Sequence, residues 1–148
     1  RASSWLRRVH TVIAAALRSL GNNSRLHEGG QDEPFQGILC FQHLTPGDLV
    51  IGAAKVLGSA QRRQRGAVLQ HGSILLATSP HAPLLPGIRE LAGSQPTADD
   101  LRAAVVRELG RDTGWHLEAE DWEPSERLRI EALVAHKYTQ AAWNRKRA

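Results

Sequence analysis

Short apolar runs separated by tight-turn residues follow one another between residues 38 and 76, and this pattern constrains the fold more than any other. Residues 52–54 (Gly-Ala-Ala) fit a tight turn, and residues 62–65 fit the tip of a hairpin. Strands joined by links this short pair with their neighbours in antiparallel fashion. We therefore predict an antiparallel meander of three adjacent strands, Asp48–Ile51, Lys55–Gln61 and Gly66–Leu76. A further short candidate strand precedes them at Ile38–Phe41.

Three further segments have the pattern of helices. From Ser4 to Leu20 apolar residues recur at steps of three and four, which is typical of an amphipathic helix. Thr97 followed by Asp100 resembles a capping box, and Gly110 is a candidate end of the helix that starts there. A third helix is expected from Ser125 to Tyr138, with core candidates at Leu128, Leu133, Val134 and Tyr138. The remaining glycine- and proline-rich segments are expected to be loops, at residues 22–36 and 79–95.

Composition limits the classes of protein that remain. The chain has 148 residues, 41% of them hydrophobic, and a net charge of +4, which suits a globular domain. Its one cysteine, Cys40, excludes an internal disulfide. No apolar run approaches the roughly 20 residues of a membrane-spanning helix, so we expect a cytoplasmic protein without a membrane partner. The histidines lack metal-ligand spacing, and we predict no metal site.

The richest motif runs from Lys55 to Leu76 and reads KVLGSAQRRQRGAVLQHGSILL. This order of a lysine, small residues, a basic tip and a His-Gly pair resembles the lipoate–protein ligase and cysteine-dependent octanoyltransferase family, within the biotin/lipoate A/B protein ligase superfamily. The resemblance implies an α+β fold with a mainly antiparallel sheet and packed helices, similar to the biotinyl/lipoyl protein ligase fold. It also implies an enzyme of protein lipoylation, which transfers an octanoyl or lipoyl group to a lysine of a lipoyl carrier domain.

The resemblance assigns roles to residues within this motif. Lys55 is expected to contact the acyl group or acyl-adenylate, where a compact ammonium group can stabilise an oxyanion. Small side chains on a strand let a ligand approach the backbone closely, and the His-Gly pair is expected beside the acyl pocket. The predicted substrate-binding residues are Gly58, Ser59, Ala60, Gln70, His71 and Gly72.

Cys40 distinguishes two mechanisms. Cysteine-dependent transferases of the superfamily have a Pro-Cys-Phe-like segment at this spacing before the lysine, and this chain has Leu39-Cys40-Phe41 there. In the transferase interpretation Cys40 is acylated by octanoyl–acyl carrier protein, Lys55 lowers the pKa of the thiol, and no cofactor is required. In the alternative, an ATP- and Mg-dependent lipoate–protein ligase, Lys55 holds lipoyl-adenylate and Cys40 is incidental.

The basic run at residues 62–65 allows a third interpretation, a non-catalytic basic binding module. No aromatic residues are interleaved with the arginines, so base stacking is unsupported and nucleic acid is not an expected partner. An acidic carrier domain suits the charge better, because opposite charges steer association. The expected partners are therefore a lipoyl carrier domain and octanoyl–acyl carrier protein.

The family carries two patterns before the helix that we expect from Ser4 to Leu20: an Arg-Arg-x-x-Gly-Gly-Gly-type loop and a His-x-x-Gly-type strand. Neither pattern precedes that helix in this sequence. We therefore expect residues 1–148 to be the C-terminal part of a single lipoyl/octanoyl transferase-like catalytic domain, incomplete at the N-terminus. Such a part should leave an apolar face of its helix and strands uncovered. We also expect Lys55, Gly58 and His71 to line one cavity, with Cys40 at its mouth.

Overall fold

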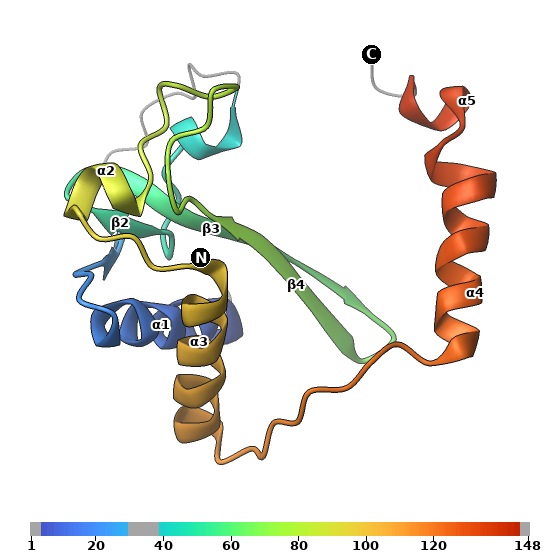
Figure 1. Ribbon diagram of the computed structural model, residues 1–148, viewed down its shortest axis with the longest axis horizontal. Coiled ribbons are helices and arrows are strands. Elements are labelled where there is room, and N and C mark those ends of the chain that lie inside the picture. The colour runs from blue at the N-terminus through green and yellow to red at the C-terminus, as the bar shows by residue number, and fades with distance from the viewer. Residues whose placement is uncertain (1–3, 30–38, 146–148) are drawn as a thin grey trace. The chain divides into compact units, whose positions relative to one another are not determined.

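The computed structural model describes residues 4–29 and 39–145 (Figure 1). The chain forms two compact units, Arg1–His116 and Leu117–Ala148, which are described separately below. The first unit is α+β and contains the predicted site residues, whereas the described elements of the second unit are all helical. None of the helices within the described ranges is long and apolar enough to cross a membrane.

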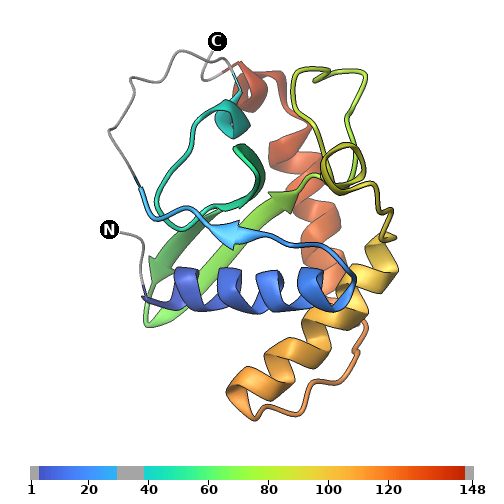
Figure 2. The ribbon, with the colours of Figure 1, turned by 90° about the vertical axis from the view of Figure 1, so that its left-hand side faces the viewer.

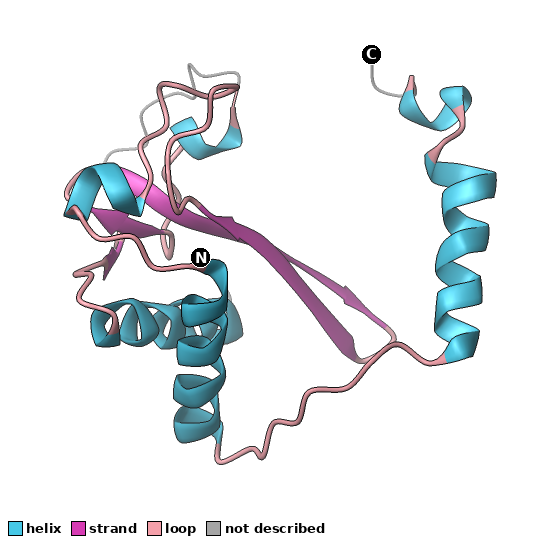
Figure 3. Cartoon of the chain, in the orientation of Figure 1, coloured by secondary structure: helices cyan, strands magenta, loops and turns pink. Residues whose placement is uncertain are grey.

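A four-stranded sheet organises the first unit (Figure 3). Its strands are β1 (Arg25–Leu26), β2 (Leu49–Ile51), β3 (Ala54–Gln64) and β4 (Ala67–Ile74). They lie in the order β1-β2-β3-β4, and each pairs with the next in antiparallel fashion. The predicted antiparallel meander is therefore confirmed, with β1 as an additional strand in a segment that we expected to be a loop.

The β3–β4 hairpin is longer than predicted because its turn is only two residues wide. Arg65 and Gly66 have φ values of 50° and 80°, the left-handed backbone that a tight hairpin turn of this length requires. Gln64 and Ala67 on either side of the turn already pair with each other. Residues 62–64, which we expected in the tip, thus belong to β3.

A β-bulge interrupts the pairing of β2 with β3. Leu49 pairs with Leu57 and Val50 with Lys55, so Val56 is an extra residue in β3 without a partner in β2. A bulge of this kind lets two successive side chains face the same side of a sheet. Val56 and Leu57 are accordingly both buried in the core.

Three helices complete the first unit: α1 (Ser4–Ser19), α2 (Ile88–Ala92) and α3 (Ala98–Thr113). Helix α1 packs against α3 and against β3 (Figure 2). The core between these elements consists of Ala14, Leu17, Leu49, Val56, Leu57, Ile88 and Leu101. Helix α3 begins with the predicted capping box of Thr97 and Asp100, but it ends at Gly114, whose φ is 73°, and not at Gly110.

The predicted strand at Ile38–Phe41 is wrong where it can be compared. Residues Cys40–Gln42 form a short 3-10 helix, labelled η1, and Ile38 lies outside the described residues. The turn is closed locally, because Leu39 N donates to Gln42 Oε1 at 3.0 Å and Gln42 N donates to Leu39 O at 2.9 Å. Such side-chain bonds to the backbone compete with strand pairing. Helix α2 likewise lies in a segment that we expected to be a loop.

The second unit contains α4 (Pro124–Leu133), a π-helical turn η2 (Val134–Tyr138) and α5 (Ala141–Asn144). The predicted helix therefore exists, but its last turn is irregular. Its four predicted core residues are exposed, a correction that concerns Leu128, Leu133, Val134 and Tyr138. The reason is that a unit of three short helical segments has too few elements to enclose them.

Among the described strands, β4 forms one edge of the sheet. β4 is the last strand in the order, and Val68 and Leu69 on it are exposed. We expected an uncovered apolar face on the helix and strands, and two exposed side chains on an edge strand do not test that expectation. The assignment of residues 1–148 to the C-terminal part of a catalytic domain stays a prediction.

Candidate functional site

The side chain of Lys55 is held by three neighbours. Its Nζ lies 2.7 Å from Asp48 Oδ2, donates to His43 O at 2.9 Å, and lies 5.3 Å from the centroid of the Phe41 ring. Both members of the ion pair are almost fully buried. Lys55 is therefore a fixed buried cation and not an exposed strand lysine.

The turn before β2 positions Asp48 for this contact. Asp48 N donates to Thr45 O at 3.0 Å, and Gly47 takes a φ of 101°, which favours glycine. Asp48 Oδ2 in turn accepts from Thr45 N at 2.8 Å and from Thr45 Oγ1 at 3.0 Å. The Thr-Pro-Gly-Asp sequence thus builds a closed turn that aims one carboxylate at Lys55.

Gly58 lies directly beneath the Lys55 side chain. A Cβ added at Gly58 would lie 2.5 Å from Lys55 Cε and 2.9 Å from Lys55 Nζ. Residues three apart in a regular strand point to opposite faces, but the extra residue Val56 brings Lys55 and Gly58 to the same face. The bulge and the missing side chain together create the space that the ammonium group occupies.

The register of the hairpin divides the other predicted residues between two faces. Ala60 pairs with His71 and Gly58 with Ser73, so by strand alternation these four residues share the face of Lys55. Of the predicted substrate-binding residues, Ser59, Gln70 and Gly72 lie on the opposite face, toward α1. The sequence motif therefore contributes to two different surfaces of the sheet.

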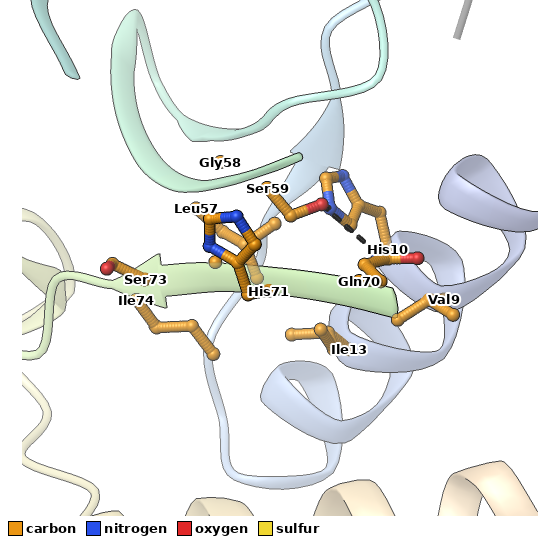
Figure 4. Close-up of a pocket in the computed structure, with 11 residues that line it drawn as sticks. Val9, His10, Ile13, Leu57, Gly58, Ser59, Gln70, His71, Ser73 and Ile74 are labelled. Carbon is orange, nitrogen blue, oxygen red and sulfur yellow. Dashed lines mark hydrogen bonds between the residues drawn. The ribbon is translucent and has the colours of Figure 1, made fainter. Parts of the chain in front are cut away.

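On the α1 side, polar side chains form a continuous hydrogen-bonded chain. His10 Nδ1 lies 2.6 Å from Gly47 O. His10 Nε2 lies 2.6 Å from Ser59 Oγ (Figure 4). Gln70 Nε2 donates to Ser59 Oγ at 3.0 Å, and Gln61 Nε2 donates to Gln70 Oε1 at 2.8 Å. We call this chain, from Gln61 through Gln70, Ser59 and His10 to Gly47, the His10 relay.

The Gly47 carbonyl at one end of the His10 relay determines which atom donates in the two hydrogen bonds of His10. The Gly47 carbonyl can only accept, so Nδ1 of His10 carries the proton. In the neutral ring Nε2 is then an acceptor, and it receives the Ser59 hydroxyl proton. Burial lowers the pKa of His10, outweighing the Gly47 hydrogen bond and Asp48, which raise it, and Lys55 lowers it further. The relay thus requires a neutral His10, and the burial favours that form.

Sequence reasoning did not select His10, since we considered that histidine only as a metal ligand. The sequence does indicate that His10 is buried, because it precedes Ala14 by four residues and Leu17 by seven, on the apolar stripe of the helix. All three side chains are buried. A polar residue in register with the core face of an amphipathic helix requires a buried partner, and here the partner is Ser59.

A pocket of about 180 Å³ lies between α1 and the β3–β4 hairpin (Figure 4). Gly58 and His71 line it, together with Val9, His10, Ile13, Leu57, Ser59, Gln70, Gly72, Ser73 and Ile74. The expectation of a single cavity is thus met for Gly58 and His71 but not for Lys55, which does not line it. The ammonium group of Lys55 is held instead against Asp48 and the His43 carbonyl.

Cys40 lies in η1, which packs against β3. Its neighbour Phe41 carries the ring beside the Lys55 ammonium group. The catalytic roles of Cys40 and Lys55, and the binding roles of the motif residues, stay predictions. Within residues 4–29 and 39–145, no group of three or more His, Cys, Asp or Glu side chains is arranged to hold a metal ion.

Comparison with known proteins identifies the family. The model of the Biotin/lipoate A/B protein ligase family matches residues 2–79, which is more than half of the 148 residues. This chain therefore belongs to the biotin/lipoate A/B protein ligase family. The resemblance inferred from the sequence motif is confirmed.

Relatives described as octanoyltransferase LipM match over most of this chain. That of Kyrpidia tusciae is 32% identical over 126 residues, covering 71% of this chain and 46% of the relative. That of Bacillus subtilis is 33% identical over 132 residues, covering 74% of this chain and 47% of the relative. The chain spans about half the length of the curated relatives it matches.

Solved structures share the fold. A crystal structure of lipoate-protein ligase A bound with ATP has a TM-score of 0.75 at 20% identity, covering 97% of this chain and 59% of that chain. A bi-partite lipoate protein ligase from Thermoplasma acidophilum, described with its E2 lipoyl domain, has a TM-score of 0.70 at 18% identity, with coverages of 95% and 57%. At this identity the likeness concerns the fold alone, and it confirms the predicted α+β class.

Proposed function

We propose that this protein transfers an octanoyl group to a lysine of a lipoyl carrier domain through an acyl-enzyme on Cys40. The observation that carries the proposal is the buried Lys55 ammonium group beside η1, the element that contains Cys40. The octanoyltransferase relatives support the choice of acyl group. The T. acidophilum ligase, which is described with its lipoyl domain, supports the choice of acceptor.

In the first step, the Cys40 thiolate attacks the carbonyl carbon of octanoyl–acyl carrier protein. A carbon–sulfur bond to Cys40 forms, the bond to the carrier thiol breaks, and the carrier leaves as a thiol that takes up one proton. The intermediate carries a negative oxygen, which a fixed cation stabilises. An ammonium group has three N–H donors, and Lys55 directs two of them to Asp48 and the His43 carbonyl. In this proposal the third is donated to the oxyanion.

In the second step, the uncharged amine of the acceptor lysine attacks the Cys40 thioester. A carbon–nitrogen bond forms, the carbon–sulfur bond breaks, and one amine proton is released as the thiolate is restored. The same third N–H of Lys55 serves this second oxyanion. Neither step requires ATP or a metal ion.

The alternative is an ATP- and Mg-dependent lipoate–protein ligase, in which Lys55 would hold lipoyl-adenylate. The two mechanisms differ in what Cys40 does. In the transferase the thiol is a covalent carrier, whereas adenylation activates the acid without it.

Mass spectrometry of the intact protein after incubation with octanoyl–acyl carrier protein tests the proposal. Since Cys40 is the one cysteine among these 148 residues, an octanoyl thioester within them identifies the nucleophile directly. We expect the adduct on Cys40 in the wild type, and neither adduct nor transfer in Cys40→Ala. If Cys40→Ala keeps full activity with free lipoate and ATP, the transferase mechanism is wrong and the ligase mechanism takes its place. Lys55→Ala should impair both routes and therefore does not discriminate between them.

A further inference from the structure

Two arginines at the tip of the β3–β4 hairpin share a face with Lys55. Arg62 pairs with Leu69 and lies two residues beyond Ala60, so by alternation it lies on the Lys55 face. Arg65, in the turn, lines a shallow hollow together with Arg62, Gln64, Ala67 and Leu69. Arg63 pairs with Val68 and lies on the opposite face.

Within the described residues of the first unit, no carboxylate forms an ion pair with the arginines of this tip. Arg62, Arg63 and Arg65 are exposed. The ion pairs in the described part of the chain all involve other residues, and no described carboxylate pairs with these three arginines. Exposed Leu69 adds an apolar contact beside Arg62. A basic rim around an apolar centre complements an acidic protein surface.

The Lys55 face of the hairpin connects this tip to the candidate site. Between Arg62 and Lys55 the face carries only the small residues Ala60 and Gly58 on β3. The seven-residue separation along β3 corresponds to roughly 20 Å, at about 3.3 Å per residue. A ligand arm laid along this strip would meet no large side chain of β3.

We propose that the hairpin tip around Arg62 and Arg65 docks the acidic carrier protein that delivers the acyl group. This inference rests on the proposed octanoyl transfer and adds to it a surface for the donor. The carrier binds the tip through its acidic surface, and its thioester reaches Lys55 along the strip of Ala60 and Gly58.

The distance selects the donor carrier over the acceptor domain. An acceptor lysine presents its amine on a four-carbon stem that spans roughly 6 Å, so its domain must bind next to the reacting carbonyl. A donor that holds its thioester on a long flexible phosphopantetheine arm can bind farther away. The separation between the tip and Lys55 therefore suits the donor.

The test compares charge reversals on the two faces of the same hairpin. Arg62→Glu/Arg65→Glu removes the proposed contact, whereas Arg63→Glu makes the same kind of change on the other face. Binding of acyl carrier protein is measured directly by titration calorimetry, so that docking is tested whether or not transfer occurs. Transfer is measured with octanoyl–acyl carrier protein and with octanoyl-N-acetylcysteamine, a small thioester that needs no docking surface.

We expect the double variant to bind the carrier about tenfold more weakly at low salt, and Arg63→Glu less than about threefold more weakly. The difference should largely vanish near 1 M salt, where the screening length is only about 3 Å. Turnover of the small thioester should be unchanged in both variants. Equal binding of acyl carrier protein by the wild type, the double variant and Arg63→Glu would overturn the inference. A wild type that binds the carrier but transfers nothing would refute the proposed function alone.

Discussion

Asp48 and Lys55 form an ion pair of 2.7 Å in which the side chains keep only 4% and 9% exposure. A charge buried this deeply is tolerated because it is paired, and removing one partner leaves the other uncompensated. The Thr45 donors fix the carboxylate, and the His43 carbonyl fixes the ammonium group. The pair therefore serves both the stability of the first unit and the orientation of Lys55.

Asp48→Asn should destabilise the protein by about 3 kcal/mol, because it leaves a buried cation without its counter-charge. Urea unfolding followed by circular dichroism measures the change. The matched control is Asp121→Asn, which breaks the exposed pair with Arg127 and should cost less than about 1 kcal/mol. A cost below 1 kcal/mol for Asp48→Asn would mean that Lys55 leaves the pair in solution.

Gly58→Ala should displace the Lys55 ammonium group, because the added Cβ would lie 2.5 Å from Cε. Lys55 cannot move without weakening its bonds to Asp48 and His43. We expect octanoyl transfer to fall by about a hundredfold, the lower end of the usual effect of removing one oxyanion donor. Ala53→Ser, in the exposed turn after β2, adds a single heavy atom elsewhere and should keep wild-type activity. Steady-state kinetics of octanoyl transfer by the two variants test this expectation. Wild-type activity of Gly58→Ala would contradict it.

Local patterns predicted most of the first unit. The antiparallel meander followed from glycine-containing turns, and the start of α3 followed from the capping box of Thr97 and Asp100. Two elements were missed because they are too short to show a periodicity: β1 has two residues and α2 has five. The strand expected at Ile38–Phe41 was wrong because the bonds between Leu39 and Gln42 close a turn there.

The arrangement of the site was harder to predict than its residues. Simple alternation places Lys55 and Gly58 on opposite faces of β3, and only the bulge at Val56 brings them together. Adjacent buried residues such as Val56 and Leu57 hint at a bulge but do not require one. Contacts between distant segments, such as His10 with Ser59, depend on how α1 packs on the sheet, which no local pattern encodes.

Ser59→Ala should destabilise the protein by about 1–3 kcal/mol, because it leaves His10 Nε2 and one Gln70 donor without their partner. Ser19→Ala is the matched control. It removes a hydroxyl bond to Ala16 O at an exposed helix end and should cost at most about 0.5 kcal/mol. Urea denaturation of the two variants measures the difference. Equal costs would show that the His10 relay adds no stability.

The charge state of His10 should make stability depend on pH in a defined direction. Its pKa lies below 6.5 in the folded protein because the ring is buried. Between that lower pKa and 6.5 the unfolded chain binds more protons than the folded chain, so the free energy of unfolding rises with pH. Stability should therefore be complete above about pH 6.5 and decrease as the pH falls below it.

Two measurements check this expectation. Nitrogen-15 NMR of the histidine side chains should show His10 as the neutral Nδ1–H tautomer at pH 7, since the Gly47 carbonyl accepts from Nδ1. Thermal unfolding between pH 5 and pH 8 should lose a component of its pH dependence in His10→Gln and keep it in His81→Gln, an exposed loop position. An Nε2–H tautomer for His10 would reverse the Ser59 bond and refute the direction assigned to the relay. An unchanged pH dependence in His10→Gln would show that the buried ring does not control stability in this range.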